Sequence, residues 1–210
     1  TKVPAVGGLC PFIRFPAGAV STQAWVNPGL GPLILDRLQQ GESAQAALDH
    51  VMARETDAEI RQLGVVDANG SSAAYTGSAT DPWAGHRTGP DYSVQGNMLV
   101  GEDTIAAMEA AFLSAQAQDL AECLLTALEA GQAAGGDRRG RQSAALIVRG
   151  AQVFPLVDLR VDEHPDPVKE LRRIFEVAKI ELFPLVKALP TAQNPRGDFA
   201  SIRAAMAPKD

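Results

Sequence analysis

The sequence predicts an α+β domain in which two antiparallel sheets pack face to face and are covered by helices on the outside. Strand-like runs and pairs of amphipathic helices alternate along the 210 residues, and short turns join neighbouring strands, which favours antiparallel pairing. Two covered sheets would bury the apolar stripes of the helices and the apolar faces of the strands. We expect one domain over residues 1–189 and a tail or subunit-contact arm over residues 190–210.

The first half of the chain predicts a strand, two helices and a hairpin. Residues 17–27 alternate as a strand does, with Val20 on an apolar face and Gln23 on a largely polar one. Residues 31–41 predict a helix with a proline in its first turn and a glycine at its end, and residues 43–55 predict a second helix. Residues 61–78 predict a hairpin, because Asn69-Gly70 suits the two positive-φ positions of a tight primed turn.

The second half predicts three strands and three helices. Residues 81–89 are expected to form a loop, and the strand YSVQGNMLV follows over residues 92–100. Two helices come next, the second ending at Gly131, and the buried-looking strand 143–148 pairs with the half-exposed strand 153–162. The last helix begins with Asp166 as its cap and Pro167 in its first turn, and Pro184 should kink or end it.

Composition and charge exclude several classes of function. The net charge of -6, with both signs interspersed, argues against a nucleic-acid partner, and no apolar run is long enough to span a membrane. Cys10 and Cys123 stand far apart and are read as free thiols, which fits a cytoplasmic protein. The three histidines are scattered without a cysteine cluster, so we expect no metal and no cofactor.

Polar residues at strand edges and in loops are the candidate site residues. Gln23 and Asn27 lie on the polar face of one strand, and Asn97 follows Gly96 near the end of another. The loop GGDRRGRQ gathers charge that would bind a carboxylate, and a loop before the 92–100 strand carries recognition residues. The first loop contributes Asp137, Arg138, Arg141 and Gln142, and the second contributes Asp81 and His86. Ordinary edge positions, a solvated charged turn and a structural tryptophan corner are the alternatives.

Long segments of the chain resemble a bacterial and archaeal family catalogued as domain of unknown function 1028. They include AVSTQAWVNPGLGPLILDRLQQGESAQAALDHVM, AYTGSATDPWAGHRTG and VDLRVDEHPDPVKELRRIFE, and the resemblance extends from Thr1 to Glu176. It implies membership of the N-terminal-nucleophile (Ntn) hydrolase superfamily, whose fold is a four-layer αββα sandwich of two antiparallel sheets. It also implies a precursor that cuts itself just before Thr1, leaving a short N-terminal peptide as a partner.

Thr1 would then supply both nucleophile and base. Its hydroxyl would attack a carbonyl, and its free α-amine, which titrates near ~7.7–8.0, would take the hydroxyl proton. We therefore expect a hydrolase of a small amide that carries a carboxylate, working through an acyl-enzyme ester in a homo-oligomer, with Thr1, Gln23 and Asn97 as catalytic residues. The alternatives are a chain boundary at Thr1, a thiol nucleophile at Cys10, and a non-catalytic module of the same fold that binds an anion or metabolite.

Overall fold

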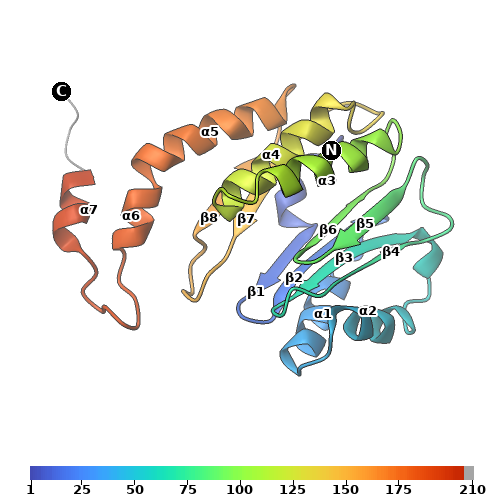
Figure 1. Cartoon of the computed structure of the whole chain (residues 1–210), viewed down its shortest axis with the longest axis horizontal. Helices are drawn as coiled ribbons and strands as arrows, with labels where there is room; N and C mark the ends of the chain where they lie inside the picture. The colour runs from blue at the N-terminus through green and yellow to red at the C-terminus, as the bar shows by residue number, and fades with distance from the viewer. Residues whose placement is uncertain (206–210) are drawn as a thin grey trace.

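The structure is a computed structural model that describes residues 1–205, and it has the α+β class that the sequence predicts (Figure 1). The main sheet has the order β1-β2-β3-β4 and is antiparallel throughout. Its strands are β1 (Pro11–Arg14), β2 (Gly18–Ala24), β3 (Arg61–Asp67) and β4 (Ser72–Thr76). The antiparallel pairs β5 (Gly85–Gly89) with β6 (Tyr92–Gly96) and β7 (Ala144–Val148) with β8 (Val157–Val161) complete the strands of the described chain.

Helices cover one face of the main sheet, and a hairpin covers the other. Helices α1 (Leu30–Gln39) and α2 (Ala44–Met52) contact β2, β3 and β4 from one side. The β5–β6 hairpin contacts β3 and β4 from the opposite side, and α3 (Asp103–Ser114) in turn contacts β5 and β6. Figure 1 shows this order, with α1 and α2 below the strands and α3 and α4 (Leu120–Ala133) above them.

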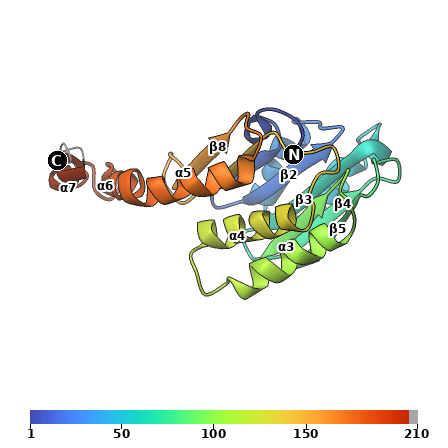
Figure 2. The same cartoon turned by 90° about the horizontal axis from the view of Figure 1, so that it is seen from above.

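The remaining helices continue from the second hairpin. Helix α5 (Pro167–Glu181) packs on β7 and β8, and α6 (Phe183–Ala188) and α7 (Phe199–Ala205) follow it. In Figure 2 these three helices extend sideways from the rest of the molecule. Two 3₁₀ turns, η1 (Val6–Gly8) and η2 (Ala58–Ile60), lie in the connections.

The apolar cores lie between helices and sheets, and between α3 and α4, rather than between the main sheet and the β5–β6 hairpin. One cluster joins α1 and α2 to β2 and β3 and includes Ile34, Leu48 and Leu63, all essentially unexposed. A second joins α4 and α5 to β7 and β8. Where β3 faces β6, polar side chains meet instead: Gly64 has no Cβ, and the amide of Gln95 occupies that space.

Several predicted elements are confirmed. The α1 helix has its proline in the first turn, and Gly41 follows with a φ of +92. The chain also breaks between α5 and α6 at Leu182, two residues before Pro184. That break is expected because proline lacks the N–H that a continuing helix needs.

Other predictions of local structure are wrong, each for an identifiable reason. The Asn69-Gly70 turn is not of the primed type, because only Gly70 has a positive φ; the Asp67 carboxylate instead accepts from the N–H groups of Asn69 and Ser71, at 2.9 and 3.0 Å. Gly131 lies inside α4, where Met108 packs over it, and does not end the helix. Asp166 does stand at the N-cap position before Pro167, as predicted, but its side chain makes no capping hydrogen bond and pairs with Arg141 at 3.3 Å.

Two stretches that the sequence leaves as loop or tail are regular. The loop over residues 81–89 contains strand β5, so His86 is a strand residue. The 190–210 segment contains helix α7, and its last five residues, 206–210, lie outside the described part of the chain.

Candidate functional site

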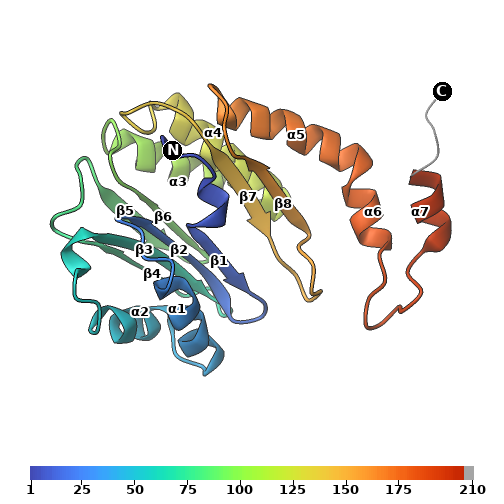
Figure 3. The same ribbon diagram turned by 180° about the vertical axis from the view of Figure 1, so that it is seen from behind.

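Thr1 lies at a pocket of about 460 Å³ between the sheet layers and helices α3 and α4. Its amine donates to the carbonyl of Ser143 at 3.2 Å, and its own carbonyl accepts from the N–H groups of Gln142 and Ser143. These bonds hold the N-terminus beside the start of β7, as can be followed in Figure 3. The residue as a whole is exposed, while its amine is partly buried against Ser143.

The charges near Thr1 come from the loop that follows α4. The Thr1 hydroxyl lies 3.4 Å from Oδ2 of Asp137, which also accepts from the backbone N–H of Lys2 at 3.1 Å. Asp137 is held by Arg139 in a two-point contact, at 3.0 Å from Nε and 2.7 Å from Nη2. The carboxylate side chain is only 9% exposed, so it is a fixed part of the pocket wall.

Burial lowers the pKa of the Thr1 amine, and hydrogen bonds lower the pKa of Asp137. Desolvation lowers the pKa of the Thr1 amine from 8.0; the Asp137 charge raises it and the Arg139 charge lowers it, and the net effect is a lower pKa. Burial alone would raise the pKa of Asp137, but hydrogen bonds from Arg139 and from the backbone N–H of Lys2 outweigh it, so this pKa is lowered. At neutral pH the amine is therefore more often uncharged than an ordinary α-amine, and it faces an ionised carboxylate.

A network of side-chain amides forms the adjoining wall. Gln62 of β3 is fully buried, and its Oε1 accepts from Gln23 Nε2 at 2.9 Å and from Asn97 Nδ2 at 3.2 Å. Its Nε2 lies within 2.8–3.1 Å of the Thr76 hydroxyl and the carbonyls of Gly85 and Gly96. Gln62 thus fixes two amides that line the pocket with Thr1.

The structure brings some of the predicted site residues together and separates the rest. Thr1, Gln23, Asn97 and Asp137 line one pocket. Gln142 does not line it, but its backbone N–H holds the Thr1 carbonyl at 2.8 Å.

The arginines are placed differently from the prediction. Arg138 is exposed and outside this pocket, and its backbone N–H bonds to the carbonyl of Met98. Arg141 is also exposed and pairs with Asp166 at 3.3 Å. Arg139, which was not among the predicted site residues, is the arginine that lines the pocket, although this residue too is exposed.

The two candidates from residues 81–89, Asp81 and His86, lie outside the Thr1 pocket. His86 contacts the Thr76 hydroxyl through Nδ1 at 2.8 Å, and burial lowers the pKa of its imidazole. The carbonyl of Asp81 accepts from the N–H of Met98. Neither residue lines the pocket that holds Thr1.

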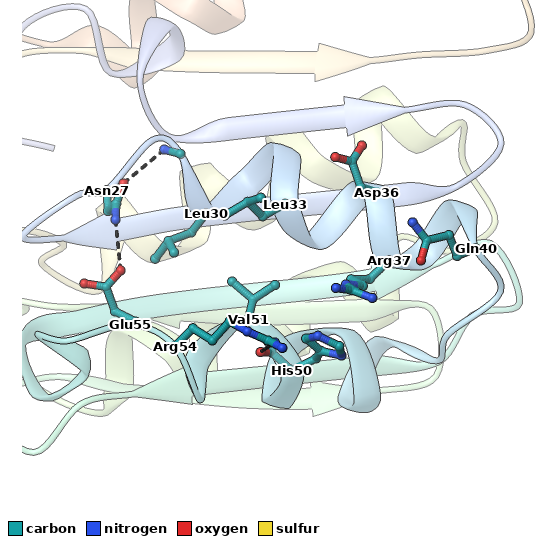
Figure 4. A pocket seen from close by; sticks show the side chains of 11 residues that line it. Asn27, Leu30, Leu33, Asp36, Arg37, Gln40, His50, Val51, Arg54 and Glu55 are labelled. Carbon is teal, nitrogen blue, oxygen red and sulfur yellow. Dashed lines mark hydrogen bonds between the residues drawn. The ribbon is translucent and has the colours of Figure 1, made fainter.

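Asn27 belongs to a second pocket, of about 390 Å³, between α1 and α2 on the outer side of the main sheet (Figure 4). Its Nδ2 donates to Glu55 at 2.9 Å, and its Oδ1 accepts from the N–H of Gly29. The acidic residues of this pocket are paired: Glu55 with Arg61 and Asp36 with Arg14. Asn27 therefore ties the loop after β2 to the end of α2 and is separate from Thr1.

Gln62, Ser143 and Arg139 are the site residues that sequence reasoning missed. Ser143 is buried; its hydroxyl donates to the carbonyl of Val3 and accepts from the N–H of Val6, so it anchors the N-terminal segment. Gln62 stood in a stretch read as an ordinary hairpin strand. A glutamine in an otherwise apolar strand was the available signal, because a buried amide needs several partners.

Two further features bear on the class of protein. Within residues 1–205, no group of three or more His, Cys, Asp or Glu side chains is arranged to hold a metal ion. The same stretch contains no helix with the length and apolar character needed to cross a bilayer.

Comparisons with known proteins agree on one family. Residues 1–171 match DUF1028, a family of unknown function. The chain is also similar to a protein of Silicibacter pomeroyi from that family, whose crystal structure gives a TM-score of 0.85 at 28% identity, covering 94% of this chain and 89% of the other. No curated protein matches the chain significantly.

Proposed function

The chain belongs to the DUF1028 family, and from the geometry around Thr1 we propose that it is an N-terminal-threonine hydrolase of small amides. In this proposal a precursor is cut before Thr1, and the freed amine becomes the base. The observation that carries it is the placement of the Thr1 amine: partly buried, bonded to Ser143, lowered in pKa and lining a pocket with two fixed amides.

The layer order supports a place for the chain in the Ntn-hydrolase superfamily. Helices α1 and α2, the main sheet, the β5–β6 hairpin and helix α3 follow one another in contact, which suits a four-layer αββα sandwich. Fold alone does not define a reaction, so the proposed reaction rests on Thr1 and the residues around it.

The proposed reaction uses one residue twice. The uncharged amine takes the proton of the Thr1 hydroxyl as Oγ1 attacks the amide carbonyl, and it passes that proton to the leaving amine as the C–N bond breaks. An acyl ester on Oγ1 remains. The same amine then takes a proton from water as the water oxygen attacks the ester carbonyl. The bond from that carbonyl to Oγ1 breaks, the amine returns the proton to Oγ1, and the acid is released.

Asn97 is suited to stabilise the charge that develops on the carbonyl oxygen. Its amide has two N–H groups, and within residues 1–205 only one hydrogen bond from it is present, to Gln62. The second N–H remains available to an oxyanion, and Gln62 holds the group in place before the reaction. Gln23 is bonded to the same Gln62 oxygen and supports this arrangement.

The test is to express the gene with the segment that precedes Thr1 and to measure intact masses for wild type, Thr1→Ala and Thr1→Ser. We expect cleavage before residue 1 in wild type and, more slowly, in Thr1→Ser, because serine keeps the hydroxyl. Thr1→Ala should remain a precursor. Efficient cleavage of the Ala variant would contradict self-processing by Thr1, and a chain that keeps its upstream segment would favour the non-catalytic alternative.

A further inference from the structure

Resting on this proposed function, we infer that the acyl part of the substrate is uncharged and apolar. The chemistry of the pocket wall points to this class. The acyl group would enter the same 460 Å³ pocket that Thr1 lines, a volume within the range of small-molecule sites.

Apart from the Thr1 amine, which serves as the base in the proposed reaction, the described residues offer a substrate in this pocket no charge without a partner. Among the described residues, Asp137 and Arg139 are the ionisable acid and guanidinium that line it, and they are bonded to each other through two contacts. Asp137 already takes Nε and Nη2 of Arg139, so a carboxylate on the acyl chain would have to share the remaining N–H groups of this guanidinium beside the Asp137 charge, which repels it. An uncharged acyl group meets no such repulsion.

The two arginines that the sequence predicts to hold a carboxylate, Arg138 and Arg141, lie outside the pocket. Arg141 is paired with Asp166 and exposed, and Arg138 is exposed beyond the pocket wall. The sequence analysis predicts a substrate carboxylate close to the scissile bond, and the positions of Arg138 and Arg141 do not favour it.

Hydrocarbon forms most of the rest of the wall. It comes from the N-terminal segment, from the chain after β6, and from helices α3, α4 and α5. The side chains are Val6, Leu9, Met98, Leu99, Met108, Leu128 and Val168. Two of them are methionines, which adapt to ligands of different shape. The polar exceptions at α3 and α4, Thr104 and Gln132, are neutral.

The wall near α4 has a built-in constraint that makes the inference testable. A Cβ at Gly131 would lie 2.6 Å from Cγ of Met108, so a methyl there must push Met108 aside. Met108 lines the pocket, whereas Leu113, on the same helix, is 44% exposed and does not line it. Met108→Trp and Leu113→Trp therefore form a matched pair with one change inside the pocket and one outside.

The experiment measures binding of butanamide, hexanamide, octanamide and suberic acid monoamide by calorimetry. The protein is the Thr1→Ala variant expressed without the upstream segment, so that it begins at residue 1 and needs no processing. Thr1→Ala prevents turnover during the titration. Full burial of a methylene corresponds to about a fourfold gain in affinity, so octanamide should bind about tenfold or more tightly than hexanamide. Suberic acid monoamide, equal in chain length but charged, should bind at least about tenfold more weakly than octanamide.

The pocket variants complete the test. In the same background, Met108→Trp should weaken octanamide binding at least about fivefold, and Leu113→Trp should leave it unchanged. Gly131→Ala serves as a second pocket variant if Met108→Trp fails to fold, as judged by circular dichroism. Equal or tighter binding of the charged monoamide, or unchanged octanamide binding in both pocket variants, would overturn the inference.

The two proposals fail in different ways. If the neutral series binds as expected but wild type hydrolyses none of its members, the apolar pocket stands and the hydrolase proposal is weakened. If wild type hydrolyses the charged monoamide in preference to octanamide, and Thr1→Ala does not, the hydrolase proposal stands and the apolar inference is wrong.

Discussion

Replacing Asp137 with asparagine removes an acidic side chain that contacts both Thr1 and Arg139. The carboxylate accepts four hydrogen bonds of 2.7–3.1 Å, two from the Arg139 guanidinium and two from the N–H groups of Arg139 and Lys2. Hydrogen bonds to charged groups contribute about 1.5–3 kcal/mol. Arg139 is 37% exposed, so water screens part of the loss, and we expect a drop in unfolding free energy of about 1.5 kcal/mol.

Asp158→Asn is the matched control for this prediction. Asp158 on β8 also holds the arginine two residues ahead, Arg160, through two contacts at 2.8 and 3.2 Å. The side chains of this pair are more exposed than those of Asp137 and Arg139, at 28% for Asp158 and 39% for Arg160. Its replacement should cost less than about 1 kcal/mol. Urea unfolding at pH 7, followed by circular dichroism, compares the two variants with wild type. Equal losses in both would refute the argument that Asp137 is an organised part of the site.

The pH dependence of this difference carries a definite sign. The folded-state pKa of Asp137 is lowered, so its stabilisation is present above the unfolded-state value of 3.8 and is lost as the pH falls through the folded value. The gap between wild type and Asp137→Asn should therefore close below about pH 3.8.

Two further predictions concern the base and the amide network. Because the pKa of the Thr1 amine is lowered, kcat/KM for a hydrolysed amide should rise with pH through a midpoint below 8.0. Asp137→Asn should lower that midpoint further, because the Asp137 charge raises the pKa of the amine. A midpoint at or above 8.0 in both proteins would contradict this prediction. Gln62→Leu removes the bonds of Gln62 to polar groups on four strands, β2, β4, β5 and β6, and should cost more than about 3 kcal/mol in urea unfolding. Gln45→Leu, at an exposed residue of α2, should cost less than about 0.5 kcal/mol; equal costs would show that the network does not stabilise the fold.

Local signals in the sequence were enough for helices α1 to α6 and the longer strands, but not for α7, whose segment has no clear periodicity. Helix α1 has its proline and its terminal glycine within a few residues of its ends, and β3 is a continuous, mostly buried strand. Strand β5 lacked such a signal: its sequence, GHRTG, has no apolar alternation, and pairing with β6 determines it. The turn after β3 is held by hydrogen bonds to the Asp67 carboxylate and does not adopt the primed type that Asn69-Gly70 favours.

The candidate site was predictable in its chemistry but not in its contacts. Thr1 as a nucleophile follows from the type of residue and the family resemblance, whereas its partner Ser143 is 142 positions away. Only the packing of the N-terminal segment beside β7 joins them. The choice of Arg139 over Arg138 and Arg141 likewise depends on which side chain turns toward Asp137, and the sequence DRRGR is compatible with any of the three.

Capture of the acyl-enzyme tests the central claim most directly. The mature chain is incubated with p-nitrophenyl hexanoate, quenched in acid and digested, and the peptides are mapped by mass spectrometry before and after hydroxylamine treatment. We predict one hexanoyl group on Thr1 that hydroxylamine removes, as an ester on Oγ1 requires, and none in Thr1→Ala. A hexanoyl group on Cys10, or equal labelling of the Ala variant, would contradict Thr1 as the nucleophile.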